Sequence, residues 1–415
     1  MTKMTMMTKR TIQHALAVIV ILSAIGLYAS AEKACATSVF SMNLLGERLE
    51  GGDTRSIALG GAYQMVHDSL GVLQLNPALL TYCRKVTVGA SQFIAMDKGR
   101  SDLYTERDVS VSYPVFMAAF PLTKFFTFGI GFRGQHDPDG TFSSIETLDR
   151  GTSSKRTFSK KGGLYSIPFS FALTVSRYAA VGLYYSLENG SIEERWDVTF
   201  NDPKFAPGVG SKKENLSGSG YGAGVLLFPD GPVMLGATFE GEIEYDAAIK
   251  ERFTLTALDT SYSGTVKVPP RFSVALTWSV VPSWNVLASY ATSDFTQFVG
   301  LNFAPDRLYR EESFAFGAEY SKGVPIKGLR FPLRFSFNYQ RLPYDFPAGE
   351  RIRKILFGLG TGLNIGGGKA KMDVALQAGK VGSLSNNTLE DRLVRFYVSV
   401  VGSEVWKRKG EGGFR

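Results

Sequence analysis

The chain has 415 residues, of which 44% are hydrophobic and 20% charged, and its formal net charge is +8. Three positive charges fall in the first ten residues and the others are scattered, so no basic patch suggests a nucleic-acid partner. Two cysteines and three histidines resemble no ligand set, so no metal or cofactor is expected. Glycine is high at 45 residues and aromatics reach 13%, which suits strands, tight turns and aromatic girdles better than helices.

Residues 1–31 have the pattern of a secretory signal peptide. A basic start is followed by an apolar run at 15–27 and by the small-x-small site Ala29-Ser30-Ala31. The alternative is an uncleaved N-terminal anchor helix, although the run is short for a membrane span. A second small-x-small site at 34–36 leaves the cleavage position open by a few residues. The sequence therefore predicts an exported protein.

The strongest pattern beyond that segment is an alternation of apolar and polar side chains with a period of two. Residues 126–133, 235–245 and 333–340 show it most clearly. Such alternation places all apolar side chains of a strand on one face. In a soluble sandwich that face points inward, whereas in a membrane barrel it points to lipid.

The connections between these segments favour the membrane barrel. Six short links alternate with seven longer polar stretches, near 95–107, 135–162, 190–215, 247–269, 295–311, 342–351 and 381–390. Outer-membrane barrels have short turns on the periplasmic side and long loops on the other. A tilted strand needs about 9–11 residues to cross a bilayer, which is longer than most soluble strands. The fourteen segments have that length, at roughly 85–94, 108–120, 125–134, 163–175, 179–189, 216–228, 233–246, 270–281, 284–294, 312–321, 331–341, 352–365, 370–380 and 391–401.

We therefore predict an all-β fold, a 14-stranded antiparallel transmembrane β-barrel over residues 85–401 of a bacterial outer-membrane protein. Both chain ends would lie in the periplasm, with residues 402–415 as a charged C-terminal tail. The alternative is a secreted β-sandwich or propeller, although no repeat of propeller length is evident.

Residues 32–84 precede the first strand and do not alternate. Small residues at 58–62 permit close approach of backbones, and Asn76-Pro77 is a turn signal. One interpretation is a small periplasmic cap. The other is a plug inside the barrel, with Asn76-Pro77-Ala78 turning the chain into the first strand.

This segment resembles the N-terminal plug of the FadL family of long-chain fatty acid transporters. That plug has a small-residue step, then an acidic residue, then an Asn-Pro-Ala turn before the first strand. The resemblance covers about 30 residues, and the matching positions are Arg55, Ser56, Gly60, Gly61, Ala62, Asp68, Asn76, Pro77 and Ala78. It implies a barrel of fourteen strands and the uptake of hydrophobic molecules across the outer membrane.

The C-terminus departs from that family, whose barrels often end on an aromatic residue that the barrel-assembly machinery recognises. Here Phe414 lies well beyond the last expected strand. Cys35 and Cys83 both lie near the mature N-terminus, where an oxidising periplasm would permit a disulfide.

A lateral opening is expected where backbone hydrogen bonds cannot form. Proline lacks an N–H, and Pro114 and Pro168 fall inside the second and fourth expected strands. Gly129 and Gly131 in the third strand permit a bulge or an inward kink. The FadL resemblance points to a side exit in the same place. The alternative is that these glycines only make room for the plug.

Charged side chains on the expected lumen face are candidates for binding a carboxylate. Alternation assigns to that face Arg133, Arg334, Arg395, Glu240, Glu242 and Glu244. The alternative reading is an ordinary network of ion pairs within the lumen.

The expected function is a channel for hydrophobic solutes such as fatty acids or hydrocarbons. The expected partners are that small molecule or lipid, the surrounding membrane lipid and the assembly machinery, with the chain as a monomer. The alternative is a non-transporting scaffold or a secretion-system partner. An enzyme is not expected: His67 falls in the expected plug and His136 in a long loop, so neither is expected on a strand face beside a serine with an acidic group to orient it.

Overall fold

The structure is a computed structural model. It describes residues 39–404 apart from 50, 51, 62, 102–104, 112–114, 148–151, 255–257, 301–306 and 346–349. The expected signal peptide, Cys35, Ala62, Pro114 and the tail from residue 405 onward lie outside the described residues.

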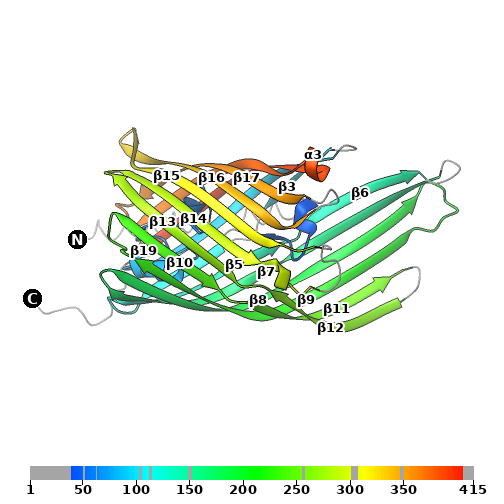
Figure 1. The fold of residues 1–415 in the computed structure, drawn as a ribbon, viewed down its shortest axis with the longest axis horizontal. Helices are drawn as coiled ribbons and strands as arrows, with labels where there is room; N and C mark the ends of the chain where they lie inside the picture. Colours follow the sequence, from blue (N-terminus) through cyan, green and yellow to red (C-terminus); the bar gives the residue numbers. More distant parts are fainter. Residues whose placement is uncertain are drawn as a thin grey trace, which may run out of the picture.

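One antiparallel sheet closes on itself to form a barrel (Figure 1). Closure comes from the first and last strands, which pair in register from Leu389 opposite Ser101 to Glu404 opposite Val86. The strands are β2 (Val86–Ser101), β3 (Thr105–Val111), β4 (Val115–Pro121), β5 (Phe126–Asp137), β6 (Gly140–Thr147), β7 (Ser153–Ser176), β8 (Ala179–Phe200), β9 (Gly208–Leu227), β10 (Val233–Glu240), β11 (Ile243–Phe253), β12 (Leu258–Val268), β13 (Arg271–Val281), β14 (Trp284–Asp294), β15 (Arg310–Ile326), β16 (Leu329–Asp345), β17 (Arg351–Ile365), β18 (Ala370–Ser383) and β19 (Leu389–Glu404).

Four strands of the barrel wall are each divided in two, so these eighteen described segments form fourteen barrel strands. The divided strands are β3 with β4, β5 with β6, β10 with β11, and β12 with β13. Both halves of the first three pair with one common neighbour, which is β2, β7 and β9 respectively. In the fourth, β12 pairs with β11 and β13 pairs with β10. The predicted fourteen-stranded antiparallel barrel is confirmed.

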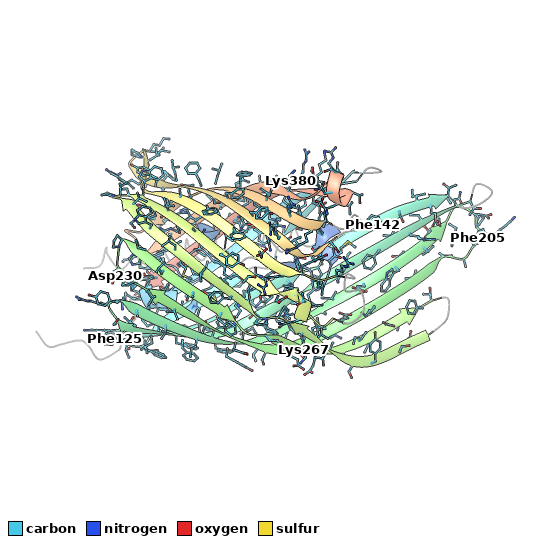
Figure 2. All side chains as sticks on the ribbon, viewed as in Figure 1. Phe125, Phe142, Phe205, Asp230, Lys267 and Lys380 are labelled. Atoms are coloured by element: carbon cyan, nitrogen blue, oxygen red, sulfur yellow. The ribbon has the colours of Figure 1, made fainter. Side chains whose placement is uncertain are left out.

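The wall of the barrel is apolar outside and polar inside. Leu183, Tyr185 and Leu187 project outward from β8 and are 61%, 50% and 41% exposed, while Tyr184 and Ser186 between them are buried. Side chains cover the outside of the ribbon along its whole length (Figure 2). This arrangement is the inverse of a soluble protein and suits a barrel whose outside contacts lipid. Among the described residues, no helix combines the length and hydropathy of a membrane span.

Several stretches expected as polar loops are instead strands. β6 and the long outer parts of β7, β8 and β9, together with the hairpin β11–β12, extend one side of the barrel beyond the other strands (Figure 1). β7 has 24 residues and β14 has 11, a difference of roughly 40 Å along a strand. The sequence pattern missed this extension because both of its faces carry many polar residues, so no apolar alternation marks it.

The expected lumen position of Glu242 and Glu244 is wrong. β10 ends at Glu240 and β11 begins at Ile243, and this interruption shifts the alternation by one residue. Glu240 is therefore buried inside, whereas Glu244 lies outside and pairs with Lys267 at 2.8 Å. A single unpaired residue is enough to reverse the faces, because the side-chain period of a strand is two.

The exposed apolar belt leads to a stability prediction. Leu183→Arg places a charge on the outward face of the belt and should cost about 2–4 kcal/mol of folding free energy in a bilayer. Urea titration of refolding into lipid vesicles measures this cost. The control is Ser211→Arg, which lies outward on the extension of β9 and should change the folding free energy little. Equal costs for the two variants would contradict the assignment of the belt.

Candidate functional site

Residues 39–83, called here the inner segment, lie against the polar inner face of the barrel. Their elements are η1 (Val39–Met42), β1 (Glu47–Arg48), α2 (Thr54–Ala58) and η2 (Pro77–Tyr82). α2 contacts β16 to β19, and η2 contacts β5 and β7 to β9, so the segment reaches opposite parts of the wall. Most of its described residues are buried.

The short helix α2 presents a cation to the wall. Asp53 caps the helix by accepting hydrogen bonds from the backbone N–H of Ser56 at 3.0 Å and from its hydroxyl at 2.5 Å. Arg55, the second residue of the helix, donates two hydrogen bonds to Glu319 of β15, at 2.7 and 2.9 Å. Glu319 is 1% exposed, and it also accepts a hydrogen bond from Arg334 at 2.9 Å. One buried carboxylate thus joins the inner segment to the barrel.

Asp68 forms a second ionic connection. It accepts from Arg55 at 3.1 Å and pairs with Lys371 of β18, which is also 3.1 Å from Asp373. Burial alone would raise the pKa of Asp68, but Lys371 and Arg55 outweigh it and hold that pKa below its ordinary range. The carboxylate is therefore charged at neutral pH, and this pair of charges is part of the network that includes Glu319.

The small residues after α2 bring the backbone against the wall. Gly60 has φ of +119° and Gly61 has φ of +145°, which L-residues with a side chain rarely adopt. Asn338 of β16 donates to the Gly60 carbonyl at 2.7 Å. A side chain at Gly317 of β15 would collide with the carbonyl of Leu59. The wall and the inner segment therefore meet backbone to backbone at this point.

Asn76 ties the other end of the inner segment to the wall. Its side-chain oxygen accepts from the N–H of Ala78 at 2.9 Å and caps η2, while its amide donates to the Ala237 carbonyl at 3.1 Å. Gly224 opposite has no side chain, which leaves space for this amide. Pro77 follows as the first residue of η2. The Asn-Pro-Ala motif therefore starts a short helix rather than turning directly into β2, which begins at Val86.

Glu47 and Arg48 anchor the start of the inner segment. Glu47 pairs with Lys354 at 2.5 Å and with Arg395 at 2.5 and 2.9 Å, and Arg48 pairs with Glu240. Burial would raise the pKa of Glu47, but Arg395 and Lys354 outweigh it and lower that pKa below its ordinary range. Three of the lumen charges identified from the sequence, Arg334, Arg395 and Glu240, thus belong to ion pairs that involve or adjoin the inner segment.

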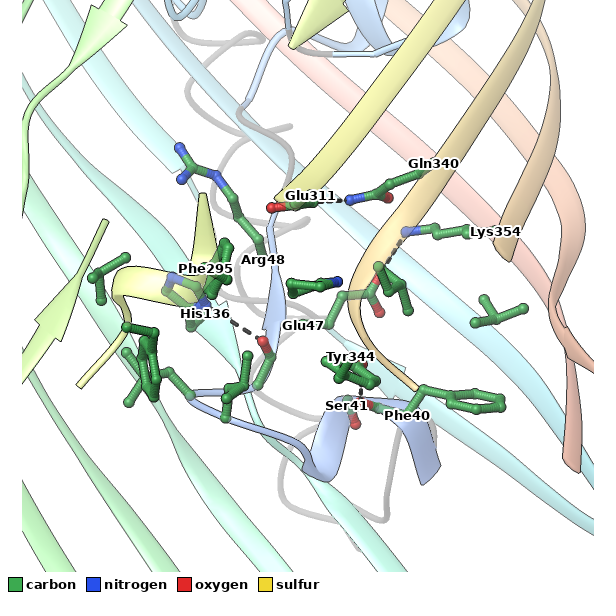
Figure 3. Close-up of a pocket in the computed structure, with 18 residues that line it drawn as sticks. Phe40, Ser41, Glu47, Arg48, His136, Phe295, Glu311, Gln340, Tyr344 and Lys354 are labelled. Carbon is green, nitrogen blue, oxygen red and sulfur yellow. Dashed lines mark hydrogen bonds and ion pairs between the residues drawn. The ribbon is translucent and has the colours of Figure 1, made fainter. Parts of the chain in front are cut away.

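An apolar cavity of about 60 Å³ lies between the start of the inner segment and the far ends of the strands (Figure 3). It is at the end of the barrel opposite Val86 and Glu404. Its apolar wall combines the inner segment with η4 (Phe295–Gln297) and the ends of β16 and β18, through Phe40, Leu44, Leu45, Phe295, Phe298, Leu342, Tyr344 and Val381. Its polar side carries Glu47, Arg48, His136, Glu311, Gln340 and Lys354.

A second, smaller cavity of about 20 Å³ lies beside the wall at β4, β5, β7 and β8. Leu73, Leu75, Pro77 and Leu80 of the inner segment line it, opposite Met117, Pro168, Ser170, Arg133 and Tyr184 of the barrel. The guanidinium carbon of Arg133 is 5.6 Å from the centre of the Tyr184 ring. Arg133 makes no ion pair with any described carboxylate.

The ladder between β5 and β7 is interrupted beside this cavity. Ile130 pairs with Phe169 and Arg133 with Ser166, but Gly131 and Phe132 have no partner in the pairing of these strands. Pro168 would stand opposite Gly131, and it has no N–H to donate. Gly129 is paired on both sides, with Ala119 and Ser170, and its Cα faces Leu80 of the inner segment. The interruption is therefore beside Gly131, and Gly129 makes room for the inner segment.

The sequence did not identify the apolar cavity, because its lining comes from eight separate segments. Phe40, Tyr344 and the Phe295–Phe298 pair carry no shared motif. A usable signal was the charge of Glu47 and Arg48, since two adjacent charges in a segment predicted to be enclosed require partners. Cys83 is buried, and burial raises its pKa to about 12. Its pairing with Cys35 stays a prediction.

Comparison with solved structures finds several outer-membrane barrels of similar fold. A FadL homologue of Pseudomonas aeruginosa superposes with a TM-score of 0.63 at 12% identity, covering 86% of this chain and 99% of that one. The toluene transporter TbuX of Ralstonia pickettii gives 0.59 at 14% identity, covering 86% and 99%. The toluene transporter TodX of P. putida gives 0.58 at 14% identity, covering 86% and 100%.

At this level of identity the likeness establishes the fold, which is that of the FadL-type barrels. No protein-family model matches the sequence, and no curated protein matches it significantly.

The Arg55–Glu319 contact leads to a second prediction. Arg55→Ala leaves Asp68 and the buried Glu319 each with one cation fewer, and it should destabilise the packed inner segment by about 3–5 kcal/mol. Hydrogen exchange followed by mass spectrometry should show faster exchange of residues 53–83, with the barrel strands still protected. Arg341→Ala removes an exposed pair with Glu312 and is the control. Unchanged protection in Arg55→Ala would show that the pair does not hold the segment.

The lowered pKa values of Asp68 and Glu47 predict the pH dependence of the same protection. A carboxylate whose folded pKa is depressed contributes stability above its unfolded pKa, and loses it as pH falls through the folded value. Protection of residues 53–83, corrected for the intrinsic exchange rate, should therefore stay constant from about pH 8 to 5 and decline only below about pH 4. A decline near pH 6 would indicate that another group controls the packing.

Proposed function

We propose that this protein is an outer-membrane channel of the FadL type that takes up hydrophobic solutes. The observation that supports the proposal is the apolar cavity between the inner segment and the barrel. The inner segment acts as a plug in this proposal, because it fills the lumen where an open pore would pass water and ions. The belt of outward apolar side chains suits an outer membrane, with the ends at Val86 and Glu404 on the periplasmic side.

The apolar cavity is the proposed entry site. A hydrophobic solute gains free energy by leaving water for a pocket lined with aromatic and aliphatic side chains. The cavity is at the end of the barrel with the longer connections, which faces the exterior in this orientation. The extension of β6 to β12 surrounds the approach to it on one side.

The interrupted ladder beside Pro168 is the proposed exit. The second cavity is lined on one side by the inner segment and on the other by the wall at this interruption. An intact closed barrel satisfies every backbone group by pairing, so an interruption at one height is a weak place in the wall. A solute that leaves sideways enters the bilayer and never has to cross the polar periplasmic end of the lumen.

A reversible cross-link tests the exit. Phe132→Cys with Ile167→Cys places two thiols on opposite positions of the interruption. Oxidation should lower the uptake of radiolabelled toluene into proteoliposomes, and reduction should restore it. Leu183→Cys with Ala223→Cys is the matched control, because these residues oppose each other in the continuous ladder of β8 and β9.

The result separates the proposal from a non-transporting scaffold. A scaffold would show no uptake above empty vesicles in either redox state. Uptake that persists equally after oxidation of the cysteines at positions 132 and 167 would support the channel and contradict the proposed lateral exit.

A further inference from the structure

The charges that line the apolar cavity are balanced within the protein. Its two cationic side chains are Arg48 and Lys354, and each already has a carboxylate partner among the described residues. The cavity wall also carries two carboxylates, Glu47 and Glu311. Glu311 is held by Arg271 at 2.7 Å and by Gln340. No cation on the described wall is left for a ligand.

Glu47 occupies the place that a carboxylate ligand would need. One oxygen of Glu47 accepts a hydrogen bond from Lys354 (Figure 3). Both of its oxygens accept hydrogen bonds from Arg395, so two cations converge on this carboxylate. Lys354 and Arg395 have side chains only 4% and 7% exposed, while that of Glu47 is 20% exposed. The protein's own carboxylate therefore neutralises both buried cations, of which Lys354 also lines the cavity.

An anionic head group in this cavity would meet two unfavourable contributions to its binding free energy. It would lose its hydration without gaining an ionic partner, which is costly for a charged group. It would also lie near Glu47 and Glu311, whose charges repel it. A neutral solute meets neither penalty and keeps the favourable burial of its apolar surface.

We propose that the solute class of this channel is neutral hydrocarbons, and that Glu47 excludes carboxylates such as ionised fatty acids. This inference rests on the proposed function and makes its substrate class specific. Arg133 does not alter the charge balance of the apolar cavity, because it lines the second cavity and lies over the Tyr184 ring. Glu47 acts here as a specificity-determining residue that mimics the rejected head group.

The test compares two probes of similar ring size that differ in charge, toluene and benzoate, at about pH 7.5. Binding to the full protein in lipid nanodiscs is measured by equilibrium dialysis, with empty nanodiscs subtracted. Wild-type protein should bind toluene at least about tenfold more tightly than benzoate. In Glu47→Gln the carboxylate charge is lost, Lys354 on the cavity wall loses its ion-pair partner and Arg395 keeps only Asp97 at 4.0 Å, so the affinity for benzoate should rise about tenfold.

Two further variants make the result specific. Glu214→Gln neutralises another buried carboxylate that pairs with a lysine, Lys212, but lines neither cavity and does not hold the inner segment, and it should give no gain for benzoate. Adding Lys354→Gln to Glu47→Gln should remove most of the gain. Hydrogen exchange of the inner segment verifies that each variant keeps its packing.

The outcomes separate the two proposals. Equal binding of toluene and benzoate by the wild-type protein would overturn the neutral-solute inference and leave the channel intact. A Glu47→Gln variant that is packed but gains no affinity for benzoate would also overturn it. Binding of neither probe by the wild-type protein would overturn the proposed function, and this inference with it.

Discussion

The structure depends on one constraint, which is that a barrel with an apolar outside must collect its polar groups inside. The lumen face of β15 to β19 alone carries Glu319, Arg334, Lys354, Lys371, Asp373 and Arg395, all of them buried. Buried charges are costly unless each is paired and hydrogen-bonded. The inner segment supplies part of the compensation through Glu47, Arg55 and Asp68. The barrel and the segment therefore stabilise each other, since removing either leaves charges of the other without partners.

Ionic contacts alone do not set the position of the inner segment. The backbone of Leu59, just before the turn at Gly60 and Gly61, lies against Gly317, and the side chain of Asn76 enters the space left by Gly224. These approaches are short because the wall carries no side chain at either point of contact. The ion pairs then stabilise the position that this close packing allows. The two cavities described above are spaces left between the inner segment and the wall.

The two cavities differ in their surroundings in a way that fits different roles. The first is enclosed by many separate segments and is balanced in charge, which suits selection of a solute. The second touches the wall where Pro168 interrupts the β5–β7 ladder, which suits release. A proline inside a closed barrel is otherwise unfavourable. Every strand there is paired on both sides, so the missing N–H removes a hydrogen bond of the ladder.

The sequence by itself determined the number of barrel strands and their order, because alternation and connection length are local properties of the chain. It did not determine the outer ends of β7, β8 and β9, which extend well into stretches expected as loops. It also identified the Arg55 to Ala78 motif as a special segment. Only the tertiary structure decided which face Glu242 and Glu244 occupy, since a local interruption at residues 241–242 reverses the alternation without any sign in composition. The same holds for the partners of Glu47, which lie more than 300 positions away at Lys354 and Arg395. Contacts of that separation exist only once the barrel has closed, and they decide whether a charge in the lumen is available to a ligand or already taken.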